Sequence, residues 1–151
     1  MLTKTPSDTW LAGLTGQRLG PYCSFNPVSR VQVWQWCSAM GDKNPLYLDE
    51  NYRSKRGFDR VVAPPAMMQV WTMRDINDQF APGSSAEPPY QVFDSMLDNG
   101  YPGNVAVSYD IRFHRYLVEG DRVHHYTTIV TISERKSTAL GEGFFVTERV
   151  E

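Results

Sequence analysis

The sequence predicts an α+β fold in which helices come first and antiparallel strands follow. Apolar residues recur at helical spacing in the first half of the chain, and they alternate with polar residues in the last third. The Pro/Gly/Ser-rich stretch APGSSAEPP (81–89) separates these two unlike parts. At 151 residues, the chain is expected to form a single domain, residues 1–151, around one core.

The first helix is predicted within NPVSRVQVWQWCSAMGD. Asn26 is the expected N-cap, Pro27 the first helical residue and Gly41 the end of the helix. The apolar positions that recur at helical spacing are Val33, Cys37 and Met40.

A second helix, residues 64–76, is predicted in APPAMMQVWTMRDI, with Pro64 or Pro65 in its first turn. Met67, Val70 and Trp71 fall on one face of it. A long antiparallel sheet needs one covered face, and this apolar helix is the natural cover.

Three strands are predicted after the separator. Val105, Val107, Tyr109, Ile111 and Phe113 alternate with polar or small residues in NVAVSYDIRFHRYL. The EGD sequence at 119–121 forms a turn, RVHHYTTIVTI a second strand and TALGEGFFVTERVE a third. The third strand runs to the last residue without a turn. Because an open strand edge invites unwanted pairing, we expect the natural chain to continue.

Composition and charge exclude several classes of protein. A formal net charge of −2 gives no electrostatic footprint for nucleic acid or an anionic membrane. No apolar stretch approaches the roughly 20 residues that span a bilayer, and the N-terminal MLTKTPSDTWLAG lacks the apolar segment of a signal peptide. The expected location is therefore cytoplasmic.

No metal site or disulfide framework is predicted. Cys23 and Cys37 form no CxxC pair and are expected to be packing residues. The only histidines are His114, His124 and His125, and the adjacent pair points to opposite faces of a strand. No cysteine or carboxylate cluster completes a metal site with them.

The segment GDKNPLYLD (41–49) carries the strongest chemical signal. Asp42 follows the helix end directly, and Pro45 stiffens the turn, so that Asp42 and Tyr47 are able to face one pocket. Asn44 is able to hold the loop by local side-chain bonds to the backbone. Taken alone, the segment favours an ordinary Asx-type turn, which needs no function.

Its neighbours favour a functional interpretation. The order of apolar helix, GDKNPLYLD, RVVAPPAMM and strands with VEGD resembles the MaoC-like hydratases and dehydratases, which have the hot-dog fold, a long antiparallel sheet wrapped around a central helix. The family motif Gly-Asp-x-Asn-Pro-Leu/Ile-His-x-Asp is matched by six residues, Gly41, Asp42, Asn44, Pro45, Leu46 and Asp49. The resemblance runs from about residue 18 to residue 151.

More narrowly, VAPPAMMQVWTM and KSTALGEGFFVTERVE are similar to the MaoC-like half of actinobacterial proteins in which that half precedes an OB-fold domain. Some of these proteins are subunits of steroid side-chain enoyl-CoA hydratases. The resemblance therefore implies that the natural chain continues into an OB-fold domain.

At two positions the sequence differs from the family, and each difference removes a group that the reaction needs. The histidine that activates water is replaced by Tyr47, and a phenol, with a reference pKa of about 10 against about 6.5 for imidazole, is a poor base at neutral pH. The glycine whose N–H holds the thioester oxygen corresponds to Pro65, which has no N–H. A shift of one position would place Ala66 there instead and restore the donor.

The resemblance then implies a non-catalytic, substrate-binding subunit that pairs with a second hot-dog subunit bearing an intact Asp/His pair, as a heterodimer or a dimer of heterodimers. Acyl-CoA is the implied substrate, and no cofactor is required. The residues expected to contact it, which could equally be core, are Asn44, Tyr47, Met67, Met68, Trp71, Phe93, Met96, Leu97 and Tyr101.

Three interpretations stay open. In the first, the chain is the substrate subunit of an enoyl-CoA hydratase that acts on a bulky, steroid-derived acyl chain. In the second, it is the substrate subunit of a (3R)-hydroxyacyl-ACP dehydratase in fatty-acid elongation. In the third, it is a non-enzymatic acyl-thioester-binding domain. A self-sufficient enzyme using Asp42 and Tyr47 is a fourth alternative. The long stretch 77–103 favours a lid or pocket wall over a bare connection.

Overall fold

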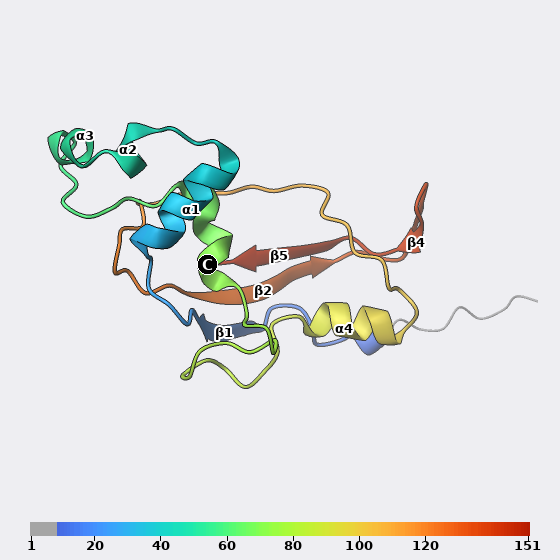
Figure 1. Ribbon diagram of the computed structural model, residues 1–151. Helices are drawn as coiled ribbons and strands as arrows, with labels where there is room; N and C mark the ends of the chain where they lie inside the picture. Colours follow the sequence, from blue (N-terminus) through green and yellow to red (C-terminus); the bar gives the residue numbers. More distant parts are fainter. Residues whose placement is uncertain (1–8) are drawn as a thin grey trace, which may run out of the picture. The chain divides into compact units, whose positions relative to one another are not determined.

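The computed structural model describes residues 9–151 (Figure 1). The prediction that the N-terminus lacks a signal peptide rests partly on residues 1–8, which lie outside the described residues. The chain divides into two compact units, each made of segments far apart in sequence. One break between the units, at Ser84 and Ser85, falls inside the predicted separator. The first unit comprises the chain up to Pro21, Ser85–Tyr109 and His125–Glu151; the second comprises Tyr22–Ser84 and Asp110–His124.

A three-stranded sheet is formed by β1 (Arg18–Cys23), β2 (His124–Ile132) and β5 (Val146–Val150), in the order β1-β2-β5. β2 and β5 are antiparallel. A short hairpin joins β3 (Lys136–Thr138) to β4 (Gly141–Gly143). The predicted second strand is thus confirmed, and the predicted third strand is present as two separate strands, β4 and β5.

Gly20 lets β1 approach β2 closely. Its φ is +121°, and a Cβ built on it would lie 2.8 Å from the carbonyl oxygen of His125. Only glycine fits there. On β2, His125 is buried and His124 is exposed, as the alternation of a strand predicts.

The first unit has its own apolar cluster between α4 (Gln91–Asp98) and β2. Val92, Met96 and Ile129 are buried in it. The short 3-10 helix η1 (Thr9–Leu11) contributes Trp10, whose ring lies edge-on to Phe144 at 5.7 Å between centroids. The stretch predicted as a lid or pocket wall therefore contains a packed helix, which the sequence analysis missed.

The core of the second unit packs around α1 (Arg30–Met40). Val33 and Cys37 are buried as predicted, whereas Met40 is exposed in the last turn. The remaining buried members of this cluster are Val28, Tyr47, Val61, Val62, Ala63, Met67 and Trp71.

The predicted start of α1 is wrong. Ser29, not Asn26, is the N-cap, and its side chain accepts a hydrogen bond from the N–H of Gln32. The reason is a long-range constraint on Val28: its N–H donates to the carbonyl of Asp121, and its carbonyl accepts from Gly120, each at 2.8 Å. A residue held in this way cannot also enter a helix. The predicted turn at 119–121 and the helix end at Gly41 are confirmed.

The second predicted helix is shorter and tighter than expected. It is a 3-10 helix, η2 (Pro65–Thr72), and Met73 is already extended. Just beyond, Asp75 Oδ1 accepts the N–H groups of Asn77 and Gln79 at 2.8 Å each. This local turn competes with continuation of the helix to residue 76. Met67 and Trp71 are buried and Val70 is half-buried, so the predicted apolar face is confirmed.

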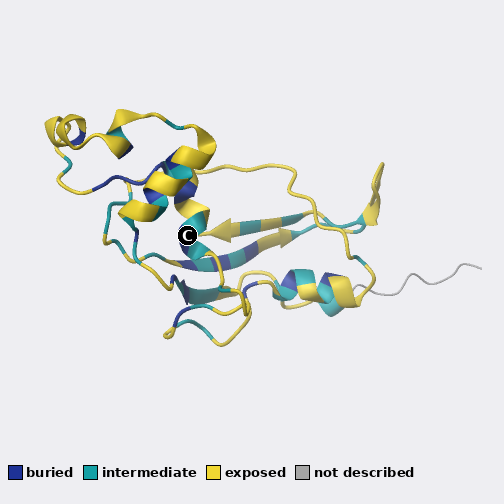
Figure 2. Ribbon diagram, viewed as in Figure 1, coloured by how far each residue is buried: buried dark blue, intermediate teal, exposed yellow. Residues whose placement is uncertain are grey.

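The predicted first strand is wrong: residues 102–114 carry no strand or bridge, and the alternating apolar side chains, Val105 to Phe113, are all exposed (Figure 2). Alternation alone does not make a strand, because a strand also needs a partner for its backbone N–H and C=O groups. The alternation is present in the sequence, but no described strand pairs with this segment.

No helix within the described residues is long and apolar enough to cross a membrane.

Candidate functional site

The loop at 41–49 is a fully hydrogen-bonded scaffold. Gly41 ends α1 with a left-handed φ of 68°, and the N–H of Asp42 donates to the carbonyl of Cys37 at 2.9 Å. Asp42 Oδ1 then accepts the N–H of Asn44 at 3.0 Å. Asn44 caps α2 (Pro45–Leu48) by accepting the N–H of Leu46 at 3.0 Å. The polar side chains at the start of the loop therefore hold its backbone.

The same logic continues at the end of the loop. Asp49 caps α3 (Glu50–Lys55) by accepting the N–H of Tyr52 at 2.9 Å. Asp42, Asn44 and Asp49, three of the motif residues, thus each serve a local structural bond. The expectation that Asn44 holds the loop is confirmed.

Tyr47 lies inside this scaffold and is only 9% exposed. Burial is the main cause that raises the pKa of its hydroxyl above the ordinary value of 10.0; the neighbouring Tyr116 and Asp42 raise it further, and a hydrogen bond with the Asn44 side chain opposes them. Asp42 is thus near enough to affect the pKa of Tyr47, but neither residue lines a cavity, so a pocket shared by the two stays a prediction. The phenol stays protonated at neutral pH and cannot act as a general base there.

A cavity of about 190 Å³ lies in the same unit, and no residue of the loop at 41–49 lines it. Its two walls are held together by an antiparallel bridge between Val62 and Val118 and by the N–H of Ala63, which donates to the carbonyl of Leu117 at 2.9 Å. Tyr116, the neighbour of Tyr47, lines the cavity. The full lining is Ala63, Pro64, Pro65, Met68, Arg112, Phe113, His114, Arg115, Tyr116 and Leu117.

The start of η2 offers this cavity no backbone donor. Pro64 and Pro65 line it, and neither has an N–H. The N–H of Met67 donates to the carbonyl of Pro64 at 2.9 Å, so it is already used. Ala66 is exposed and lies outside the lining.

The predicted substrate-binding residues are scattered, and two of them, Asn44 and Tyr47, line neither cavity. Met68 lines the cavity, whereas Met67 and Trp71 are 1% and 3% exposed and belong to the core of the second unit. Leu97 is exposed on α4. Phe93, Met96 and Tyr101 belong to the apolar cluster of the first unit.

The sequence analysis missed the other wall of the cavity. It is formed in part by four residues of the predicted first strand, Arg112, Phe113, His114 and Arg115. The available signal was their composition, since basic and aromatic residues follow one another there just before the VEGD turn.

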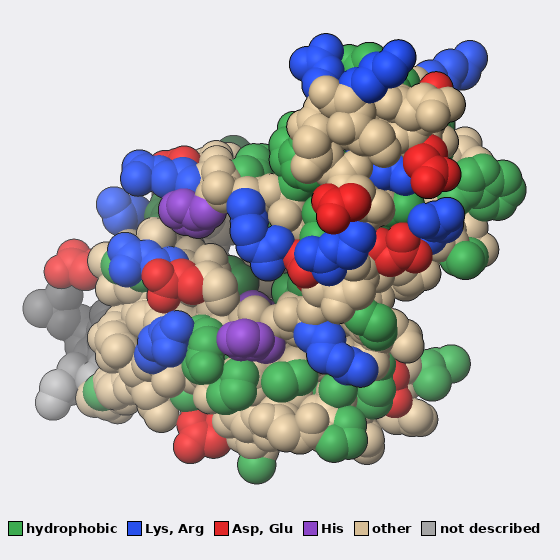
Figure 3. All heavy atoms as spheres, turned by 90° about the vertical axis from the view of Figure 1, so that its left-hand side faces the viewer, with side chains coloured by type: hydrophobic (Ala, Val, Ile, Leu, Met, Phe, Trp, Pro, Cys, Tyr) green, Lys and Arg blue, Asp and Glu red, His purple; other side chains and the backbone are tan. Residues whose placement is uncertain are grey.

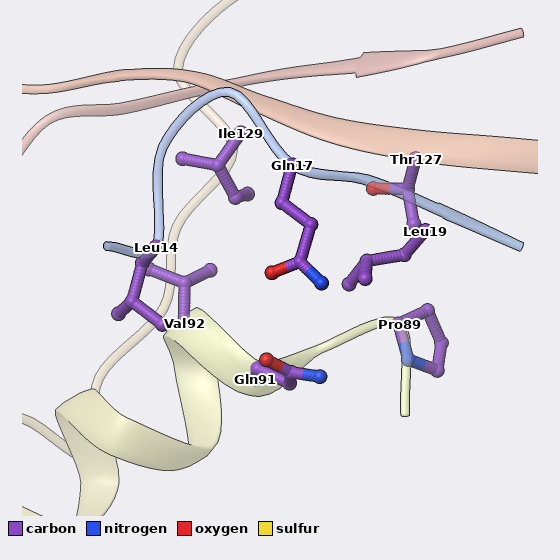
Figure 4. Close-up of a pocket in the computed structure, with 8 residues that line it drawn as sticks. All are labelled: Leu14, Gln17, Leu19, Pro89, Gln91, Val92, Thr127 and Ile129. Atoms are coloured by element: carbon purple, nitrogen blue, oxygen red, sulfur yellow. The ribbon is translucent and has the colours of Figure 1, made fainter. Parts of the chain in front are cut away.

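A second, smaller cavity lies in the first unit and is shown in Figure 4. Gln17 and Gln91 reach into it from opposite sides, among Leu14, Val92 and Ile129. Its volume of about 10 Å³ suits a single water molecule and excludes an acyl chain.

Charges of both signs are mixed on one face of the molecule. On the face in Figure 3, Lys/Arg and Asp/Glu side chains are interspersed. A nucleic-acid site would show a continuous basic patch.

Comparison with known proteins defines the class. The family model described as the FAS1-like dehydratase domain region matches residues 14–151. The chain belongs to this MaoC-like family, and its fold is the α+β hot-dog fold that the motif predicted.

Particular relatives narrow the comparison. The chain is 39% identical over 138 residues to a probable enoyl-CoA hydratase alpha subunit of Thermomonospora curvata, a match that covers 91% of this chain and 43% of the relative. It is 35% identical over 130 residues to the 3-oxo-4,17-pregnadiene-20-carboxyl-CoA hydratase alpha subunit of Mycobacterium tuberculosis, covering 86% of this chain and 41% of the relative. The chain thus spans less than half the length of these two curated relatives.

A solved structure has a similar fold. In the crystal structure of the ChsH1-ChsH2 complex from Mycobacterium tuberculosis, one chain matches with a TM-score of 0.82 and 32% identity, covering 95% of this chain and 83% of that chain.

Proposed function

We propose that this chain is the substrate-binding, non-catalytic subunit of a heteromeric enoyl-CoA hydratase whose substrate carries a bulky, steroid-derived acyl chain. The observation that carries the proposal is Tyr47, a buried phenol with a raised pKa at the position of the family's catalytic histidine. The relatives named as hydratase alpha subunits support the reaction class, and the pregnadiene carboxyl-CoA substrate in one name supports the acyl group.

The chemistry of hydration explains why a partner is needed. Water adds to carbon 3 of the enoyl thioester while a proton is delivered to carbon 2, and negative charge builds on the thioester oxygen. A base must accept the proton of the attacking water, and an N–H must stabilise the oxyanion. Tyr47 is unsuited to the first role and Pro65 to the second. The partner subunit supplies both, and this chain supplies part of the pocket.

Co-expression with a hot-dog subunit that carries an intact Asp/His pair tests the proposal. The two chains are expected to co-purify as a heteromer that hydrates a steroid side-chain enoyl-CoA. Substituting the partner's histidine should abolish this activity, whereas Tyr47→Phe should leave it within about threefold, because the phenol takes no part in proton transfer.

The word dehydratase in the family description favours a second candidate, the substrate subunit of a (3R)-hydroxyacyl-ACP dehydratase. A heteromer that turns over acyl-ACP and not acyl-CoA would establish it. A chain that never co-purifies with a hot-dog partner, yet binds acyl-CoA as a homodimer, would be a non-enzymatic acyl-thioester-binding protein.

A further inference from the structure

The cavity beside Tyr116 has a size and shape suited to part of a ligand only. Pockets that enclose a whole drug-sized ligand measure about 300–1,000 Å³. This cavity, at about 190 Å³, is too small for a fused ring system together with its carrier. Pro64, Pro65, Met68 and Phe113 give it largely apolar walls. It suits a slender, mostly apolar arm.

The cavity lining includes two arginines and one histidine. They are Arg112, His114 and Arg115, and no carboxylate is among the lining residues. Arg115 is already neutralised, because its Nη1 donates to Asp121 Oδ2 at 2.5 Å and to the carbonyl of Tyr116 at 2.9 Å. Asp121 also faces Arg60, at 3.8 Å.

Arg112 is different. Within residues 9–151, its guanidinium makes no hydrogen bond or ion pair, so its donors are available to a ligand. A guanidinium presents paired N–H donors that match the oxygens of phosphate better than an ammonium does. An unpaired arginine on an apolar cavity without carboxylates is therefore arranged for an anion joined to an apolar arm.

We infer that this cavity binds the phosphate-bearing arm of a thioester carrier, with Arg112 as the residue that contacts the phosphate. The inference rests on the proposed function, since it assigns the carrier end of the same substrate. The acyl group then lies beyond the cavity, and Arg112 determines specificity by selecting a phosphorylated carrier over an uncharged thioester.

Three thioesters of one acyl group identify the phosphate. Acyl-CoA carries nucleotide phosphates and a pantetheine phosphate, acyl-4′-phosphopantetheine carries only the latter, and acyl-pantetheine carries none. Each is titrated calorimetrically into the chain with its co-purified hot-dog partner, or into the chain alone if none co-purifies. The variants are Arg112→Gln and Arg112→Lys, and the control is Arg149→Gln, an exposed arginine on β5.

Arg112→Gln should weaken acyl-CoA binding by about tenfold or more, Arg112→Lys should weaken it less, and neither should change acyl-pantetheine binding. Equal losses for acyl-CoA and acyl-4′-phosphopantetheine assign the contact to the pantetheine phosphate; a loss for acyl-CoA alone assigns it to the nucleotide. Unchanged acyl-CoA binding, or an equal loss for all three thioesters, would overturn the role of Arg112. If the unsubstituted protein binds none of them, the proposed function itself is wrong.

Discussion

The loop at 41–49 and the turn at 63–67 lie in the same unit, and in a working hydratase each would supply half of the chemistry. The loop keeps its scaffold: Asp42, Asn44 and Asp49 all make the bonds that shape it. The turn has two successive prolines, Pro64 and Pro65, and the family resemblance predicts a backbone donor at the position of Pro65. Scaffold and chemistry are therefore encoded by different residues, and the scaffold persists here beside side chains unsuited to the reaction.

The largest effect is expected when the base and the oxyanion donor are restored together. Tyr47→His alone should give no measurable hydration, because the oxyanion donor is still absent. Tyr47→His with Pro65→Gly should exceed the single variant by about 10²–10³ in rate, which is the usual effect of one oxyanion donor. Measurable turnover by Tyr47→His alone would show that Ala66 supplies the donor.

Two adjacent methionines in η2, Met67 and Met68, allow packing and binding to be tested separately. Met67 is 1% exposed, so Met67→Ala should lower the free energy of unfolding by about 2–5 kcal/mol. Met68 lines the cavity and is 39% exposed, so Met68→Ala should change stability by less than about 1 kcal/mol and weaken thioester binding instead. Urea denaturation and calorimetry measure the two effects, and the reverse pattern would exchange the roles of these residues.

The loop caps should show a smaller effect on stability. Asn44→Ala and Asp49→Ala each remove the acceptor for a helix N-terminal N–H, at a cost of about 1 kcal/mol. Asp59→Ala is the matched control, because Asp59 is exposed and caps no helix. Denaturant midpoints compare the three variants. If the two cap substitutions lower stability no more than the control does, the motif residues do not have this structural role.

The smallest expected effect is a pH dependence of the free energy of unfolding, which arises from Tyr47. Its folded-state pKa is raised above 10.0, so the folded chain holds this proton more tightly than the unfolded chain. The stability this provides is fully present below pH 10 and is lost as pH rises through the folded pKa. Unfolding measured from pH 8 to pH 11 should therefore show a steeper decline in the parent than in Tyr47→Phe. Parallel curves would contradict the burial of the hydroxyl.

Local signals in the sequence predicted local structure well. Gly41, the turn at 119–121 and the β-branched run in β2 each specify a conformation through their own chemistry, and all three were correctly predicted. The family motif also led to the correct hot-dog fold.

Features that depend on distant partners were missed. The start of α1 is set by bonds between Val28 and the turn at 120–121. The alternation at 105–113 specifies a strand only if another strand pairs with it, and no described strand does. Arg112 becomes part of a cavity wall only because a bridge at Val118 brings its segment to Val62. Each of these features depends on a contact between two segments, and the pattern of residues within one segment cannot predict such a contact.

The most direct test of the central claim is a hydration assay on the purified chain without any partner, using a steroid side-chain enoyl-CoA. The account predicts no turnover above background for the parent chain, and the same result for Asp42→Ala. Addition of the hot-dog partner should produce activity. Turnover by the chain alone that Asp42→Ala abolishes would contradict the account, because it would show that Asp42 and Tyr47 form a working site.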